Sequence, residues 1–201
     1  MFLPQWNGIR LLHHPQRIVQ LWTDTSRQKG IGGYVLRPGE TLSSIHTPAQ
    51  LFSTTVPQRH TAKHINCKEM YAVLHALCTW TTESRACRIK LHCDNEAVMA
   101  ALAKRSIKGQ GISPLRHISL HIALNDIELH CVWIPTKEKA LADILSRWDI
   151  EKVAILCPNV HWKQSQTTHQ TPDTRIATYP PKPHDISGGD SAPRRDTHTP
   201  D

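Results

Sequence analysis

The spacing of apolar residues changes along this 201-residue chain, and the order of the changes limits the folds it can adopt. Three short extended patterns at 18–24, 32–36 and 51–56, separated by turn sequences, predict an antiparallel meander. Helical and alternating patterns then follow one another, which predicts the order helix, strand, helix, helix, strand, helix. The predicted helices begin near 66, 95, 113 and 137, and the predicted strands cover 89–93 and 127–133. This order predicts an α/β fold, a mixed five-stranded sheet with helices on its faces.

Four acidic residues stand at the ends of these predicted elements. Asp24 and Asp94 close two strands, and Glu69 and Asp143 fall early in two helices. Ligand sites of α/β sheets gather at the carboxyl ends of the strands, so we expect all four to converge at one edge. Carboxylates that lie so near one another repel, and hard divalent cations remove that repulsion. The pattern therefore predicts a carboxylate metal site suited to phosphodiester chemistry.

Two asparagines accompany the acids. Asn66 is expected to cap the helix that carries Glu69, which would then hold the third position of a capping box. Asp94 or Asn95 is expected to cap the helix that follows. Asn66 and Asn95 can each serve as a cap alone or contact a ligand, and the sequence leaves both roles open.

The net charge of +7 and the isoelectric point near 9.3 suit a polyanionic partner. Residues from about 164 onward carry nearly equal numbers of acidic and basic side chains, so the positive excess belongs to the part with the acidic motifs. That part includes a group of basic residues after Asp94, namely Lys104, Arg105, Lys108 and Arg116. They predict either a nucleic-acid contact or a solvated helix face.

Composition divides the chain into three parts. We expect 1–16 to be a lead-in, 17–150 to be one folded domain, and 151–201 to be a C-terminal extension, disordered from about 164 where apolar side chains become rare. No apolar run reaches the roughly 18 residues of a membrane span, and the N-terminus lacks a signal-peptide pattern. The six cysteines form no C-x-x-C pair and indicate buried thiols in a reducing compartment. These features predict an intracellular protein with no membrane partner.

The motifs around the four acids resemble those of the type 1 ribonuclease H domain. In that family the acids stand in a T-D-A-S-like motif, an N-x-x-E-L-like helix start, a D-N after a strand and an A-D-x-L-S-R ending. This chain has TDTS at 23–26, NCKEM at 66–70, CDN at 93–95 and ADILSR at 142–147. The resemblance covers about 17–148 and is closest to reverse transcriptases of tyrosine-recombinase retrotransposons, including fungal ones. FLPQWNGIRLL at 2–12 also resembles the stretch that joins the polymerase part in such polyproteins.

The resemblance implies a ribonuclease H-like fold and endonucleolytic cleavage of the RNA strand of RNA–DNA hybrids, with two Mg²⁺ or Mn²⁺ ions. It implies catalytic and metal-binding roles for Asp24, Glu69, Asp94 and Asp143. The nucleic-acid contacts that it suggests are Asn66, Asn95, Lys104 and Arg105. It further implies the polymerase part of a reverse transcriptase as a partner, and the cytoplasm or nucleus as the location.

Two positions depart from the family pattern. Cellular members carry a His in the loop before the last Asp, whereas 133–143 contains none here. Lys139 stands where related sequences often have Asn. The alternative to an enzyme is therefore an inactive ribonuclease H-like remnant that only binds nucleic acid. An integrase or transposase of the same broad fold is disfavoured by Glu69, which lies between the first and second Asp.

Overall fold

The structure is a computed structural model that describes residues 17–160. A single five-stranded sheet has the order β3-β2-β1-β4-β5, in which β1 pairs antiparallel with β2 and parallel with β4. The outer pairs are β2 with β3, antiparallel, and β4 with β5, parallel. The predicted α/β class with a mixed five-stranded sheet is confirmed.

The predicted strands and helices occur in the predicted order, and short helices that were not predicted lie between and after them. The strands are β1 (Ile18–Thr25), β2 (Ile31–Leu36), β3 (Leu51–Thr54), β4 (Arg88–Cys93) and β5 (Glu128–Trp133). The helices are α1 (Gln58–Thr61), α2 (Ile65–Thr79), α3 (Thr81–Ser84), α4 (Glu96–Lys104), α5 (Ile112–Leu124), α6 (Ala140–Ser146) and α7 (Ile150–Leu156). Four short 3-10 helices lie at Leu42–Ser44, Pro48–Gln50, Gly109–Gly111 and Thr136–Lys139.

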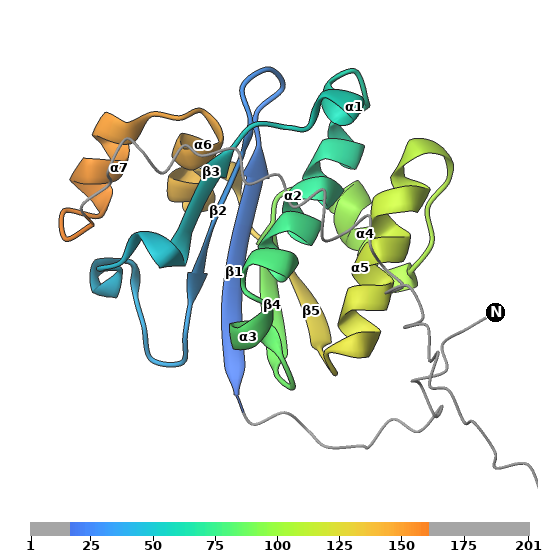
Figure 1. Ribbon diagram of the computed structural model, residues 1–201, viewed down its shortest axis with the longest axis horizontal. Helices are drawn as coiled ribbons and strands as arrows, with labels where there is room; N and C mark the ends of the chain where they lie inside the picture. The colour runs from blue at the N-terminus through green and yellow to red at the C-terminus, as the bar shows by residue number, and fades with distance from the viewer. Residues whose placement is uncertain (1–16, 161–201) are drawn as a thin grey trace, which may run out of the picture.

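Helices cover both faces of the sheet (Figure 1), with α2, α4 and α5 on one face and α6 and α7 on the other. The alternation of β1 explains the two layers, because successive side chains of a strand point to opposite faces. Val19 and Leu21 enter the larger core, under α2. Trp22 lies on the other face, where its ring stacks between Tyr34 at 4.7 Å and His92 at 4.0 Å. This second face forms a smaller core with α6 and α7.

A glycine lets α6 approach the sheet closely. Gly32 pairs with Asp24 across the β1–β2 ladder. A Cβ on Gly32 would lie 2.5 Å from Leu145 Cβ and even closer to the backbone nitrogen of Ser146. Only a residue without a side chain fits there. The end of α6 therefore rests directly against the part of β1 that carries Asp24.

Several element boundaries differ from the prediction. β1 was predicted to end at Asp24 and continues one residue further, to Thr25. The cap of α2 is His64, whose Nδ1 accepts a hydrogen bond of 3.2 Å from the backbone N–H of Asn66. The prediction of Asn66 as the cap, with Glu69 in a capping box, is therefore wrong. Asn95 does cap α4, by accepting a 3.1 Å hydrogen bond from Val98 N.

The first part of the predicted C-terminal extension packs against the fold. The segment 151–160, placed by composition in an extension, contains most of α7. Val153, Cys157 and Val160 are buried in the smaller core beside Leu141 and Leu145 of α6. The predicted lead-in at 1–16 and the segment from about 164 lie outside the described residues. In the described part of the chain, no helix has the length and apolar character to cross a membrane.

Candidate acidic site

Three of the four predicted acids meet at one edge of the sheet. Asp24 comes from β1, Glu69 from α2, and Asp94 from the residue after β4. One carboxylate oxygen of each lies within 4.8 Å of the others. The parallel pairing of β1 and β4 places their carboxyl ends side by side, and α2 crosses above them. The convergence predicted for these three residues is present.

The ammonium group of Lys139 lies between two of these carboxylates. Its Nζ is 2.5 Å from Asp24 Oδ1 and 2.5 Å from Asp94 Oδ1. The Lys139 side chain is completely buried, with 0% exposure. Burial alone would lower the pKa of this amine, but the charges of Glu69 and Asp24 and the hydrogen bonds to both aspartates raise it above its usual value. Lys139 is therefore charged at neutral pH and acts as the cation of the cluster.

The outer oxygens of the two aspartates are also bound by the protein. Ser146 Oγ donates to Asp24 Oδ2 at 2.8 Å, and Thr136 Oγ1 donates to Asp94 Oδ2 at 2.8 Å. Each aspartate therefore has both oxygens in hydrogen bonds.

Glu69 is the exception within the cluster. Its side chain is buried, and Oε2 has no hydrogen-bond partner among the described residues. The pKa of Glu69 is raised to about 8, mainly by burial and also by the charges of Asp24 and Asp94, while the charge of Lys139 acts to lower it. A buried, unpaired carboxylate oxygen costs free energy unless a ligand or proton satisfies it. Glu69 is thus the acid most open to an added cation.

Asp143 does not join the set of carboxylates within 4.8 Å. Its Oδ1 accepts two hydrogen bonds of 2.8 Å from Nε and Nη2 of Arg147. The Arg147 side chain is 58% exposed, so this ion pair lies at the surface. Asp143 lies in the first turn of α6, on the helix whose last residue, Ser146, contacts Asp24. It remains a predicted fourth member, held near the cluster by α6.

The two asparagines contact each other. Asn95 Nδ2 donates a 3.0 Å hydrogen bond to Asn66 Oδ1, which links the starts of α2 and α4 beside the acids. Lys104 and Arg105 are exposed at the other end of α4, roughly 14 Å along the helix from Asn95. Nucleic-acid contact by these four residues stays a prediction.

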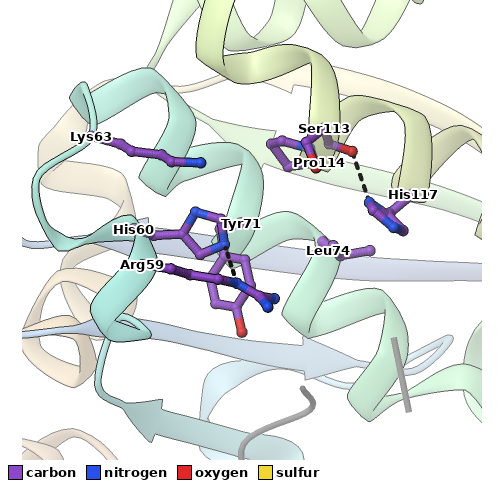
Figure 2. Close-up of a pocket in the computed structure, with 8 residues that line it drawn as sticks. All are labelled: Arg59, His60, Lys63, Tyr71, Leu74, Ser113, Pro114 and His117. Carbon is purple, nitrogen blue, oxygen red and sulfur yellow. Dashed lines mark hydrogen bonds between the residues drawn. The ribbon is translucent and has the colours of Figure 1, made fainter. Parts of the chain in front are cut away.

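A basic pocket of about 280 Å³ lies elsewhere on α2 and was not predicted (Figure 2). It is lined by Arg59, His60, Lys63, Tyr71, Leu74, Ser113, Pro114 and His117. Tyr71 and Leu74 leave α2 on a different face from Glu69, because successive helical residues turn by about 100°. The pocket therefore opens away from the acidic cluster. Its residues come from α1, α2, α5 and the turn between α1 and α2, and no local motif marks them as neighbours.

Comparison with known proteins identifies the fold. No family model matches the sequence, and no match was found among curated proteins. The crystal structure of LC11-RNase H1 in complex with RNA/DNA hybrid matches with a TM-score of 0.52 and 17% identity, over 69% of this chain and 99% of that chain. RNase H1 from the halophilic archaeon Halobacterium salinarum NRC-1 matches with a TM-score of 0.50 and 12% identity, over 68% and 98%. The chain has the ribonuclease H-like fold.

A ribonuclease H-like fold implies a divalent metal, and the carboxylates can be tested for it. Three hard oxygen donors within 4.8 Å, one of them unpaired, form a suitable ligand set. Lys139 does not fit, because its ammonium already bridges Asp24 and Asp94. With Lys139 in this position, the cluster does not fit a metal ion that bridges the same two oxygens.

Proposed function

We propose that this protein is a metal-dependent endonuclease that cleaves the RNA strand of RNA–DNA hybrids. The observation that carries the proposal is the convergence of Asp24, Glu69 and Asp94, from three different elements, at the strand ends of a ribonuclease H-like sheet. Asp143 is proposed as the fourth catalytic acid. The ions are Mg²⁺ or Mn²⁺, two in number, which would supply an activated water and neutralise the charge on the leaving oxygen.

An RNA–DNA hybrid is the proposed substrate. The likeness to a ribonuclease H1 crystallised with an RNA/DNA hybrid supports this choice, together with the chain's net charge of +7. Asn66 and Asn95 are proposed to contact the hybrid beside the acids, and Lys104 and Arg105 to contact its phosphates. The 2′-hydroxyl is the group by which a protein distinguishes the RNA strand from DNA.

The setting of this activity is proposed from the sequence motifs. The four acid motifs and the lead-in at 2–12 support a fragment of a retrotransposon reverse transcriptase polyprotein. Its polymerase part would be the partner, and the cytoplasm or nucleus would be the location. The domain would cover 17–150, with α7 packed against it at the start of the C-terminal extension.

The second candidate is a ribonuclease H-like module that binds nucleic acid without cutting it. The ammonium of Lys139 between Asp24 and Asp94 favours this candidate, because it offsets part of the negative charge of the acids without any metal. The two candidates share hybrid binding and differ only in hydrolysis.

The deciding experiment is hydrolysis of an end-labelled RNA–DNA hybrid in Mg²⁺ or Mn²⁺. Wild-type protein is expected to cut the RNA strand, and Asp94→Asn is expected to abolish cutting. Asp126→Asn is the matched control, since Asp126 is exposed and has a φ of 50°, a conformation that Asn also adopts. A folded wild-type protein that binds the hybrid and leaves it intact in both ions would establish the binding module instead.

A further inference from the structure

The buried ammonium of Lys139 sits where two carboxylates would hold a metal ion. Its Nζ makes equal contacts of 2.5 Å with Asp24 Oδ1 and Asp94 Oδ1. Oxygen ligands hold Ca²⁺ at about this distance, and they hold the smaller Mg²⁺ at about 2.0–2.1 Å. Lys68, the other buried lysine of the described region, instead donates to the carbonyl of Arg27 at 2.9 Å.

The turn after β5 fixes Lys139 in this place. Ile134 N donates to Cys93 O, which ties the start of the turn to the end of β4. The 3-10 helix Thr136–Lys139 then brings two side chains to Asp94, since Thr136 binds Oδ2 and Lys139 binds Oδ1. Lys139 also immediately precedes α6. It therefore connects the turn to the helix while its side chain contacts the acids at the sheet edge.

The ammonium and a bridging metal ion exclude each other. Both would need the inward oxygens of Asp24 and Asp94 at the same time. Two cations separated by only a few ångströms in a buried site also repel strongly. One positive charge leaves the cluster incompletely neutralised, and Glu69 Oε2 remains without a partner. The cluster therefore retains affinity for a divalent ion once the lysine leaves.

We propose that Lys139 is an internal competitor for the metal site, so that a divalent ion enters between Asp24 and Asp94 only when the lysine side chain withdraws. This inference rests on the proposed function, because it concerns the metal site of that activity. The apparent affinity for the ion then equals the intrinsic affinity multiplied by the fraction of molecules in which Lys139 has withdrawn. Metal loading becomes a regulated step, governed by the position of one side chain.

The test is to measure Mn²⁺ binding in the absence of nucleic acid. The electron paramagnetic resonance signal of free Mn²⁺ reports how much of the ion remains unbound. Lys139→Gln and Lys139→Met remove the charge at similar size, and Lys137→Gln is the control, an exposed lysine on the same 3-10 helix. Both Lys139 variants are expected to bind Mn²⁺ at least about tenfold more tightly than wild type, and Lys137→Gln is expected to match wild type. Wild-type protein that binds Mn²⁺ as tightly as the Lys139 variants would overturn the proposal.

A melting measurement covers the case in which the variants fold poorly. Without metal, both Lys139 variants are expected to melt below wild type, because removing one partner leaves buried acids uncompensated. Mn²⁺ is expected to raise the melting temperature of the variants more than that of wild type. NaCl of equal ionic strength is not expected to produce this difference. Variants that stay unfolded in Mn²⁺ would contradict the proposal. Adding Asp94→Asn to Lys139→Gln should remove the gain in Mn²⁺ affinity.

Hybrid cleavage, measured separately, distinguishes this inference from the proposed function. Tighter Mn²⁺ binding by Lys139→Gln without cleavage by any variant would support the competitor and reject the nuclease. Cleavage by wild type at the same Mn²⁺ concentration as Lys139→Gln, with equal Mn²⁺ affinities, would support the nuclease and reject the competitor.

Discussion

The hydroxyl of Ser146 donates a 2.8 Å hydrogen bond to Asp24 Oδ2, although 122 positions separate the two residues. Both residues are buried, so the bond forms where little water competes. It joins the end of α6 to β1 and orients the Asp24 carboxylate, whose other oxygen faces Lys139. The geometry of the acidic site therefore depends on how α6 is seated.

Ser146→Ala is expected to lower the free energy of unfolding by about 1.5–3 kcal/mol, because a buried charged acceptor loses its donor. Urea denaturation measures the loss, with Ser106→Ala as the control at an exposed serine. A Ser146→Ala variant within about 0.5 kcal/mol of the control would show that the bond contributes no net stability.

Gly32→Ala is expected to displace α6 from the sheet and to destabilise the protein by about 3 kcal/mol or more, since the added methyl overlaps Ser146 and Leu145. Gly39→Ala is the comparison, because Gly39 has a φ of +83° and open space around it. Backbone strain alone should cost that variant about 1–2 kcal/mol. Thermal melting of both variants gives the difference, and equal losses would contradict the close-packing argument.

Arg105→Gly combined with Lys104→Ala is expected to weaken hybrid binding without weakening the fold. Arg105 ends α4 with a φ of 50°, a conformation that glycine adopts without strain. Removing both charges should reduce the slope of log affinity against log salt by about 2, if each side chain contacts one phosphate. Fluorescence anisotropy with a labelled hybrid at several salt concentrations measures the slope. An unchanged slope would assign these residues to a solvated helix face.

His75 is expected to make the protein less stable in acid. Burial lowers the pKa of His75 to about 4, against 6.5 for the free side chain. The unfolded chain therefore takes up the proton first, and the stability present above pH 6.5 is lost as the pH falls from 6.5 toward 4. His75→Leu should gain about 2 kcal/mol relative to wild type between pH 7 and pH 4.5. Urea denaturation at both pH values tests this, and a constant difference would rule it out.

Local patterns were sufficient for the elements near the site. The helical spacing through Met70, Val73 and Leu77 predicts α2, and all three residues are buried in the larger core. Alternation through Ile89 and Leu91 likewise predicts β4, where both are fully buried. These predictions succeed because burial on one face imposes a period on the sequence.

The errors lie where contacts across the fold replace local preference. Asn66 has a suitable side chain for a cap, yet His64 takes that role and Asn66 pairs with Asn95. Residues 151–160 were assigned to a C-terminal extension, and the packing of Val153 and Cys157 against α6 was not predicted. Neither outcome follows from neighbours in the sequence, because the partners are supplied by other elements.

Residue patterns along the chain were enough to predict the order of the main elements, the mixed sheet, and acids at the ends of two strands and the starts of two helices. Which of these groups meet depends on how the elements pack. Packing brings one carboxylate oxygen each of Asp24, Glu69 and Asp94 within 4.8 Å of the others and places the ammonium of Lys139 among them. Asp143 instead forms an ion pair with Arg147. The reason is physical: hydrophobic period is a local property, whereas a buried charge is fixed by whichever distant partner can neutralise it.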